Sequence, residues 1–211
     1  MGQLNLADWV DCTEVEGPGK RFALWVQGCT LRCHGCCNSN FFELTPKYIV
    51  ESTEVLDWIK QSHIKHKIDG ITLLGGEPML QARGLAEIAT GCQRLGLSVM
   101  VFTGYTIEYL NKCTMLGIQE LLQVTDILVD GPYVAGQFDS KRNWAGSTNQ
   151  RFHFLTKRYT PGIEWDSTFA NGIEVRVYTD GTVRTNGWPY LFSKPMILGQ
   201  VDATEAERII F

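Results

Sequence analysis

Four of the seven cysteines fall within a nine-residue stretch, and three of them have the spacing of a metal site. Cys29, Cys33 and Cys36 form the pattern C-x3-C-x2-C, and three thiolates in one loop can hold three irons of a [4Fe-4S] cluster. Such a cluster normally has four cysteine ligands. Three ligands leave one iron open to a substrate, as catalytic zinc sites keep one open position. Cys37 directly follows Cys36, so we expect its side chain to point away and to be a poor fourth ligand.

Two other interpretations of this cysteine cluster stay open. A structural zinc site could use Cys37 or His34 as its fourth ligand, or the thiols could be reduced and free of metal. A disulfide framework is disfavoured, because the cysteines are odd in number and clustered. The N-terminus has no basic start followed by an apolar stretch, so we expect no secretory signal and a reducing, cytoplasmic environment.

A second motif, Gly75-Gly76-Glu77-Pro78, ends a short apolar segment. Glycines allow the backbone to approach a ligand closely, and a glutamate can accept a hydrogen bond from a cationic amine. The alternative is an ordinary turn from a strand into a helix, with Pro78 near the helix start.

The composition describes a globular chain without a nucleic-acid or membrane partner. The 211 residues are 44% hydrophobic and 20% charged, which supports a sizeable core and excludes a disordered chain. The net charge of −4 argues against a general nucleic-acid binder, which usually carries a basic stripe. No apolar run reaches the length of a membrane span.

Apolar strands that alternate with helices predict an α/β fold. Near-continuous apolar strands are typical of a parallel sheet covered by helices. The chain is too short for a closed eight-fold barrel, so we expect an open partial (β/α) barrel with its ligand at the carboxyl ends of the strands, where Thr103 and Asp130 also lie. The expected strands are 21–27, 70–74, 97–102 and 124–129, and the expected helices are 51–67, 79–95 and one or two short ones within 106–122.

The last part of the chain has a different pattern and is predicted to be an extension. Residues 1–152 are expected to form the core, with the cluster loop at 28–40, and residues 153–211 the extension. Alternating residues around Asp180-Gly181 predict a β-hairpin over 173–185, and the chain closes with Trp188-Pro189-Tyr190 and Ile209-Ile210-Phe211.

The cysteine pattern after the first strand, followed by Gly75-Gly76-Glu77 after the second, resembles the radical S-adenosylmethionine superfamily. This resemblance implies a [4Fe-4S] cluster on Cys29, Cys33 and Cys36. Its open iron would bind the amino and carboxylate groups of S-adenosylmethionine, whose amino group the Gly-Gly-Glu motif holds. The expected cofactor contacts are Gly35, Gly75, Gly76, Glu77, Pro78, Thr103, Asp130, Ser147 and Asn149.

Four further segments, in the same order, resemble the activating enzymes of glycyl-radical enzymes. They are 17–19, 102–105, 129–133 and 144–151. The resemblance implies an oxidoreductase that cleaves S-adenosylmethionine to a 5′-deoxyadenosyl radical and installs a glycyl radical on a partner like anaerobic ribonucleotide reductase or formate-lyase. It also implies a flavodoxin or ferredoxin-type reductant and a possible monovalent cation at Asp130.

Three departures from this family's pattern keep other functions open. Cys37 stands where the family usually has an aromatic residue, Glu77 stands where its members often have Asp, and residues 153–211 extend beyond the usual end. A radical enzyme that modifies a peptide or a small molecule, with the extension building its pocket, is one alternative. A non-catalytic zinc or iron–sulfur module is the other.

Overall fold

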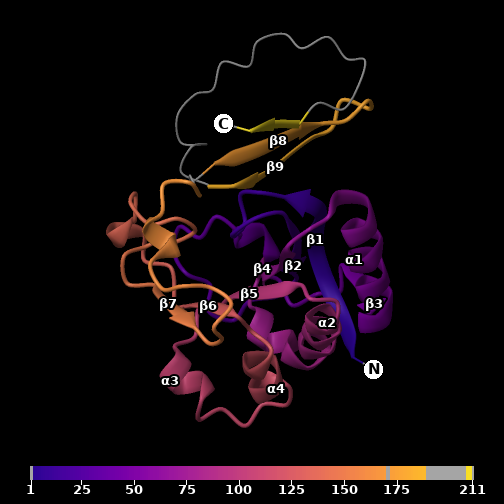
Figure 1. The fold of residues 1–211 in the computed structure, drawn as a ribbon. Coiled ribbons are helices and arrows are strands. Elements are labelled where there is room, and N and C mark those ends of the chain that lie inside the picture. Colours follow the sequence, from indigo (N-terminus) through magenta and orange to yellow (C-terminus); the bar gives the residue numbers. More distant parts are fainter. Residues whose placement is uncertain (1, 170–171, 189–207, 211) are drawn as a thin grey trace.

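The centre of the protein is a seven-stranded sheet with four parallel strands in its middle (Figure 1). The computed structural model describes residues 2–169, 172–188 and 208–210. The sheet order is β3-β1-β2-β4-β5-β6-β7, and its two edges do not pair with each other, so the predicted open, mostly parallel α/β fold is confirmed. The strands are β1 (Gln3–Thr13), β2 (Arg21–Val26), β3 (Tyr48–Glu51), β4 (Gly70–Gly75), β5 (Ser98–Phe102), β6 (Ile127–Asp130) and β7 (Arg151–Phe154).

Three antiparallel strands flank the parallel ones, and the sequence analysis did not predict them. β1 pairs with β2 and β3, and β7 pairs with β6. β1 carries its buried Leu4 and Leu6 only at its start, and register shifts interrupt its pairing with β2. The continuous apolar pattern of a doubly covered strand is therefore missing in β1.

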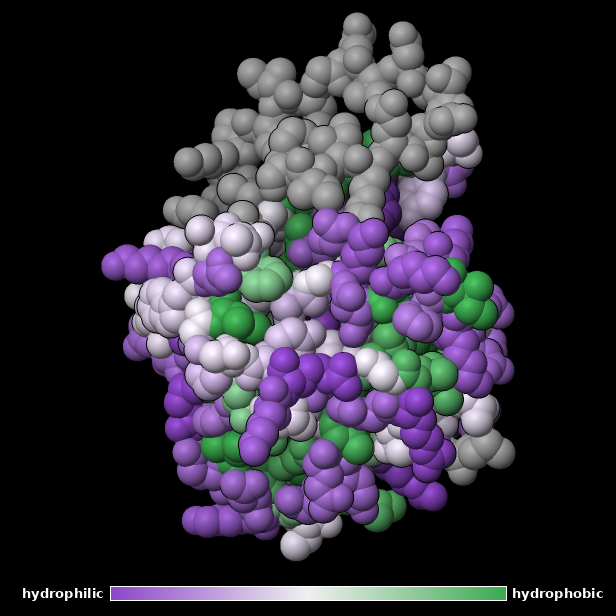
Figure 2. All heavy atoms as spheres, in the orientation of Figure 1, coloured by the Kyte–Doolittle hydropathy of each residue, from purple (hydrophilic) through white to green (hydrophobic). Residues whose placement is uncertain are grey.

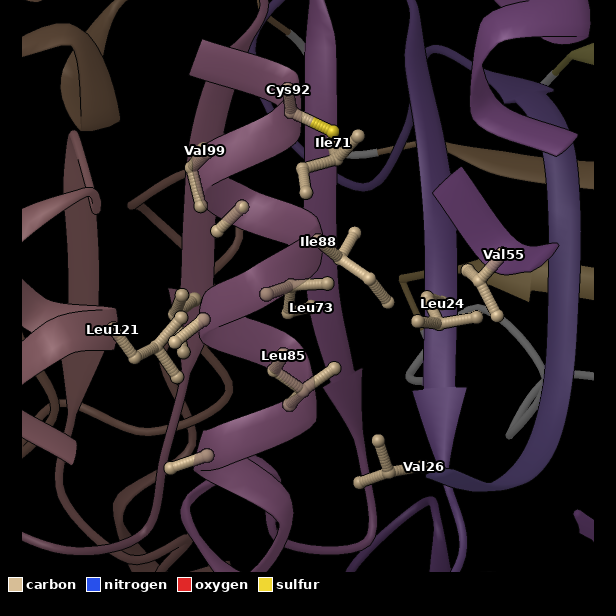
Figure 3. Packing of buried hydrophobic residues seen from close by; sticks show 14 of the residues in the cluster. Leu24, Val26, Val55, Ile71, Leu73, Leu85, Ile88, Cys92, Val99 and Leu121 are labelled. Atoms are coloured by element: carbon tan, nitrogen blue, oxygen red, sulfur yellow. The ribbon is translucent and has the colours of Figure 1, made fainter. Parts of the chain in front are cut away.

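The helices occur where the apolar periodicity predicts them. They are α1 (Ser52–His66), α2 (Ala82–Arg94), α3 (Ile107–Leu110) and α4 (Ile118–Gln123), with short 3-10 turns η1 (Ser39–Phe41), η2 (Pro78–Gln81), η3 (Ala135–Gln137) and η4 (Ile163–Trp165). On α2, Leu85, Ile88 and Cys92 share one face and point at Ile71 and Leu73 of β4 (Figure 3). Burial of this stripe fixes the helix against the sheet.

Residues in the parallel strands alternate between the two faces of the sheet. Leu24 and Leu73 belong to the core under the helices, whereas Trp25 and Leu74 belong to a separate cluster on the opposite face. Chain segments after β6 help to cover this second face, since Trp144 packs there with residues of β5 and β6. The functional cavity described below lies on this face.

The predicted hairpin is present in a second, smaller sheet near the C-terminus (Figure 1). It consists of β8 (Ile173–Val177), β9 (Val183–Gly187) and β10 (Arg208–Ile210), in the order β10-β8-β9. The hairpin contacts the core, because the Glu14 N–H donates to Glu174 Oε1 over 2.8 Å. Pro189, Tyr190 and Phe211 lie outside the described residues, and the predicted domain boundary at 152/153 stays a prediction.

The face of the molecule in Figure 2 mixes hydrophilic residues with small hydrophobic patches. Leu116 and Tyr109 are among the exposed hydrophobic side chains of the described chain. Within residues 2–169, 172–188 and 208–210, no helix combines the length and the hydrophobicity that a membrane span requires.

Candidate functional site

A cavity of about 430 Å³ lies where β2, β4 and β5 end, as predicted for ligand sites of this fold class. Its volume is in the range of small-molecule sites. Its walls include the following predicted residues: Cys29, Cys33, Gly35, Cys36, Gly75, Gly76, Glu77 and Thr103. The cysteine motif and the Gly-Gly-Glu motif, distant in sequence, therefore share one cavity.

The cysteine loop is held against the sheet by backbone hydrogen bonds. The Gly28 and Cys29 N–H groups donate to the carbonyls of Phe41 and Phe42, over 2.8 and 3.0 Å, so the loop returns to the strand that it leaves. Gly35 has a φ of +76°, a conformation that favours glycine, between Cys33 and Cys36. The loop thereby turns all three cysteines toward the same cavity.

In the Cys29 and Cys36 thiols, burial acts to raise the pKa, and hydrogen bonds to the sulfur atoms act to lower it. Burial raises the pKa of Cys29, although the backbone N–H groups of Arg32 and Leu31 donate to its sulfur and oppose the rise. A hydrogen bond from the Cys37 thiol lowers the pKa of Cys36 to about 7. Because Cys37 contacts Cys36 in this way and lines the cavity, the expectation that its side chain points away is wrong.

The donor set fits a [4Fe-4S] cluster. In the described part of the chain, no three His, Cys, Asp or Glu side chains converge closely enough to hold a single metal ion. A cuboidal cluster needs a different arrangement, because each thiolate binds its own iron and the ligands stand around the cluster. Cys29, Cys33 and Cys36, arranged along the wall of one open cavity, supply such a set.

Glu77 is a buried carboxylate that faces this cavity. Its side chain is 1% exposed. Oε1 accepts from the Met79 N–H at 2.9 Å and from Thr103 Oγ1 at 2.8 Å, and Oε2 accepts from the Gly104 N–H at 2.9 Å. Burial raises the pKa of Glu77, and no salt bridge to Glu77 is found within the described residues. A buried carboxylate without a cationic partner is suited to a ligand ammonium group.

The two glycines before Glu77 have a structural role that the sequence analysis did not predict. A side chain at Gly76 would collide with the Gly28 carbonyl oxygen, and a Cβ on Gly75 would lie 2.7 Å from Trp25 Cα. The Gly76 N–H donates to the Val26 carbonyl over 2.8 Å. Because Gly75 and Gly76 have no side chains, the end of β2 can pack closely against them. Both glycines also line the cavity.

Pro78 supports the turn that positions Glu77. It is the first residue of η2, and Glu77 is the N-cap of that turn because its carboxylate accepts from the Met79 N–H. Pro78 has no N–H to satisfy and a fixed φ, both of which suit this position. The alternative of a strand-to-helix turn is therefore correct as local structure, and the same turn aims Glu77 at the cavity.

Asp130 lies at the predicted strand end, but its side chain is not part of the cavity wall. Arg151 donates to it from Nε at 3.0 Å and from Nη2 at 2.6 Å, and the Ile107 N–H donates over 2.7 Å. Burial alone would raise the pKa of Asp130, but these hydrogen bonds lower it overall. The carboxylate is thus already paired with a guanidinium, and a monovalent cation at Asp130 stays a prediction.

Ser147 and Asn149 hold the loop between β6 and β7 rather than line the cavity. Ser147 Oγ accepts from the Val134 N–H at 3.2 Å, and Asn149 Nδ2 donates to the Pro132 carbonyl at 2.8 Å. The neighbouring Gln150 lines the cavity instead. Its Oε1 accepts from the Gly146 N–H at 2.8 Å, so it also stabilises the loop.

The wall residues that the sequence analysis missed as site residues include Glu16, Gly187 and Trp188. Glu16 lies between β1 and β2, while Gly187 and Trp188 come from the end of β9. Burial raises the pKa of Glu16, and its Oε1 accepts from the Gly187 N–H at 2.7 Å. The only sequence signal for Glu16 was its position directly before the segment 17–19.

Comparison with known proteins decides what kind of site this is. Residues 15–153 match the family described as a 4Fe-4S single cluster domain. The chain belongs to this family. The match covers the cysteine loop and the Gly-Gly-Glu motif, and it favours an iron–sulfur cluster over the zinc alternative.

Several relatives align over nearly their whole length. The chain is 32% identical to the anaerobic ribonucleoside-triphosphate reductase-activating protein of Vibrio cholerae, over 72% of this chain and 99% of that protein. The protein of the same name from Escherichia coli K12 shows the same identity and coverage, and that of Enterobacteria phage T4 is 31% identical over 66% of this chain and 87% of its own length. Among solved structures, QueE from Escherichia coli is similar with a TM-score of 0.40 and 17% identity, over 59% of this chain and 68% of that one.

Proposed function

We propose that this protein cleaves S-adenosylmethionine reductively and installs a glycyl radical on a partner enzyme of the anaerobic ribonucleotide reductase kind. The observation that carries the proposal is the single cavity lined by Cys29, Cys33, Cys36 and the buried Glu77. The names of the relatives, matched over almost all of their length, support the same activity and partner.

Each part of the cavity has a role in this reaction. Cys29, Cys33 and Cys36 would hold a [4Fe-4S] cluster, which when bound would supply the one electron for the reductive cleavage of S-adenosylmethionine to methionine and a 5′-deoxyadenosyl radical. Glu77 accepts hydrogen bonds from the methionine amino group. Thr103 fixes the Glu77 carboxylate, and the apolar walls at Leu74 and Phe102 keep water from the reacting atoms.

The glycines of the cavity complete the binding surface. Gly35 lies between two of the cysteines, and Gly75 and Gly76, which pack against the end of β2, line the cavity beside Glu77. Asp130, Ser147 and Asn149 act as positioning residues, because their hydrogen bonds hold the loops after β5 and β6 in place. We infer a flavodoxin or ferredoxin-type reductant, since one electron is needed per cleavage, and a cytoplasmic location, in which the thiols stay reduced.

Electron paramagnetic resonance tests this proposal directly. The anaerobically reconstituted protein is mixed with S-adenosylmethionine, dithionite and an anaerobic ribonucleoside-triphosphate reductase. A glycyl doublet on the reductase is expected, and Cys33→Ala should abolish both the doublet and methionine release. Cys113→Ala is the matched control, because Cys113 does not line the cavity.

The same experiment separates the alternatives. Release of 5′-deoxyadenosine without a protein doublet would instead support a peptide or small-molecule substrate. A colourless, zinc-containing protein that releases no methionine would support a non-catalytic module.

A further inference from the structure

The end of β9 enters the proposed active-site cavity. Gly187 and Trp188 line the same cavity as Cys36 and Glu77. Both lie beyond residue 153, where the match to the iron–sulfur family ends. This segment is therefore an addition to the family's common core, and its presence in the cavity calls for a role of its own.

Hydrogen bonds to Glu16 of the core and to Gly172 of the extension hold this segment in place. The Gly187 N–H and Asn186 Nδ2 both donate to Glu16 Oε1, over 2.7 and 3.0 Å. The Trp188 N–H donates to the Gly172 carbonyl over 2.8 Å, and the Trp188 ring lies 5.7 Å from that of Phe138. Main-chain hydrogen bonds with a side-chain anchor are the means by which proteins hold extended peptides.

The backbone conformation and the packing at Gly187 both require a glycine. Its φ is +105°, which favours glycine. In the direction that an L side chain would take, a Cβ would collide with the Gly172 carbonyl and lie 2.7 Å from Val15 Cγ2. The second Cα hydrogen, which only glycine has, fills that direction, and Gly187 itself is part of the cavity wall.

The other glycines in the cavity wall all lie within residues 15–153, the part of the chain that matches the iron–sulfur family; they are Gly35, Gly75, Gly76, Gly104, Gly131 and Gly146. These glycines belong to the walls that surround the cofactors. Gly187, by contrast, is presented from a separate sheet, as a substrate segment would be.

We propose that Gly187 is an internal hydrogen-atom donor, so that the protein can form a glycyl radical on its own chain. The inference rests on the proposed function. One electron from the reductant breaks the carbon–sulfur bond of S-adenosylmethionine, which gives methionine and a 5′-deoxyadenosyl radical. That radical takes one hydrogen atom from the Gly187 Cα, so 5′-deoxyadenosine is released and the unpaired electron stays on Gly187.

Deuterium transfer tests this donor without any partner enzyme. The full chain, produced with [2,2-²H₂]glycine and reconstituted anaerobically, is incubated with S-adenosylmethionine and dithionite. We expect 5′-deoxyadenosine that carries one deuterium, and a glycyl signal whose splitting changes with the label. Gly187→Ala should lose the deuterium transfer, whereas the matched control Gly136→Ala should keep it, because a Cβ at Gly136 meets nothing within 4 Å.

A second measurement avoids the risk that Gly187→Ala misfolds. Exposing the reacted, unsubstituted chain to oxygen should cleave the backbone at the radical site, and mass spectrometry of the tryptic peptide that begins at Thr185 should locate the break at Gly187. Unlabelled 5′-deoxyadenosine and an intact peptide would overturn the inference and leave the proposed function standing. No methionine release at all would contradict the proposed function itself.

Discussion

Replacing Glu77 by glutamine should weaken the binding of S-adenosylmethionine strongly while preserving the cavity. Glutamine keeps an Oε1 that can accept from the Met79 N–H and Thr103 Oγ1, which now lie at 2.9 and 2.8 Å, but its amide nitrogen cannot accept from the Gly104 N–H as Oε2 does. The carboxylate charge is lost, and with it a charge-assisted hydrogen bond from the ligand amino group. Such a bond contributes about 1.5–3 kcal/mol, so we expect the dissociation constant to rise about 10- to 150-fold.

The pH dependence of binding gives the same prediction a second, independent readout. Burial raises the pKa of Glu77 in the ligand-free protein, and the N–H groups of the ligand's amino group bind the ionised carboxylate better than the protonated one. Affinity should therefore increase as the pH rises through this raised pKa and become constant above it. In Glu77→Gln the affinity should not change over this pH range.

Anaerobic equilibrium titration of the reconstituted protein, without reductant, measures both effects. Cluster absorbance and circular dichroism establish that the variant is loaded and folded. Glu120→Gln is the matched control, since Glu120 is exposed on α4 and does not line the cavity. If folded Glu77→Gln bound S-adenosylmethionine as tightly as the unsubstituted protein, the assignment of Glu77 to the amino group would be refuted.

Three further substitutions test other parts of the structure. Gly76→Ala should destabilise the fold by about 1–3 kcal/mol, since the new Cβ would collide with the Gly28 carbonyl. Thermal unfolding should show a lower Tm, and an unchanged Tm would contradict this packing. Arg151→Ala should cost about 1–3 kcal/mol near neutral pH, because Asp130 loses its guanidinium partner. The pKa of Asp130 is lowered in the folded state, so the loss of unfolding free energy should be fully present above about pH 4. It should disappear as the pH falls through the lowered pKa. Urea titrations at several pH values can measure this change. Cys36→Ser should reduce the iron bound after reconstitution, whereas Cys12→Ser should leave it unchanged, as iron analysis would establish.

The parallel strands and the long helices could be predicted because their buried residues follow the regular sequence spacing of each element type. Leu85, Ile88 and Cys92 of α2 recur with helical spacing, and all three are buried against the sheet. The strand ends that carry Cys29 and Glu77 follow from the same pattern, because parallel strands bring their carboxyl ends to one edge. Local sequence was sufficient for these features.

Features that depend on distant partners could not be predicted. Asp130 has the position of a ligand, but its carboxylate is paired with Arg151, 21 residues later, and Asp130 does not line the cavity. Glu16 is paired with Asn186 and Gly187, which are about 170 positions away in the chain. No local spacing rule reports such a contact, so these wall residues were visible only in the folded structure.

The central claim is that three cysteines hold a cluster whose open iron binds the amino group of S-adenosylmethionine. Electron–nuclear double resonance on the reduced, reconstituted protein with ¹⁵N-amino-labelled S-adenosylmethionine tests it most directly. We predict a ¹⁵N coupling that shows nitrogen bound to the cluster, and its loss in Cys33→Ala. A cluster signal without any ¹⁵N coupling, or a chain that takes up no iron, would contradict the claim.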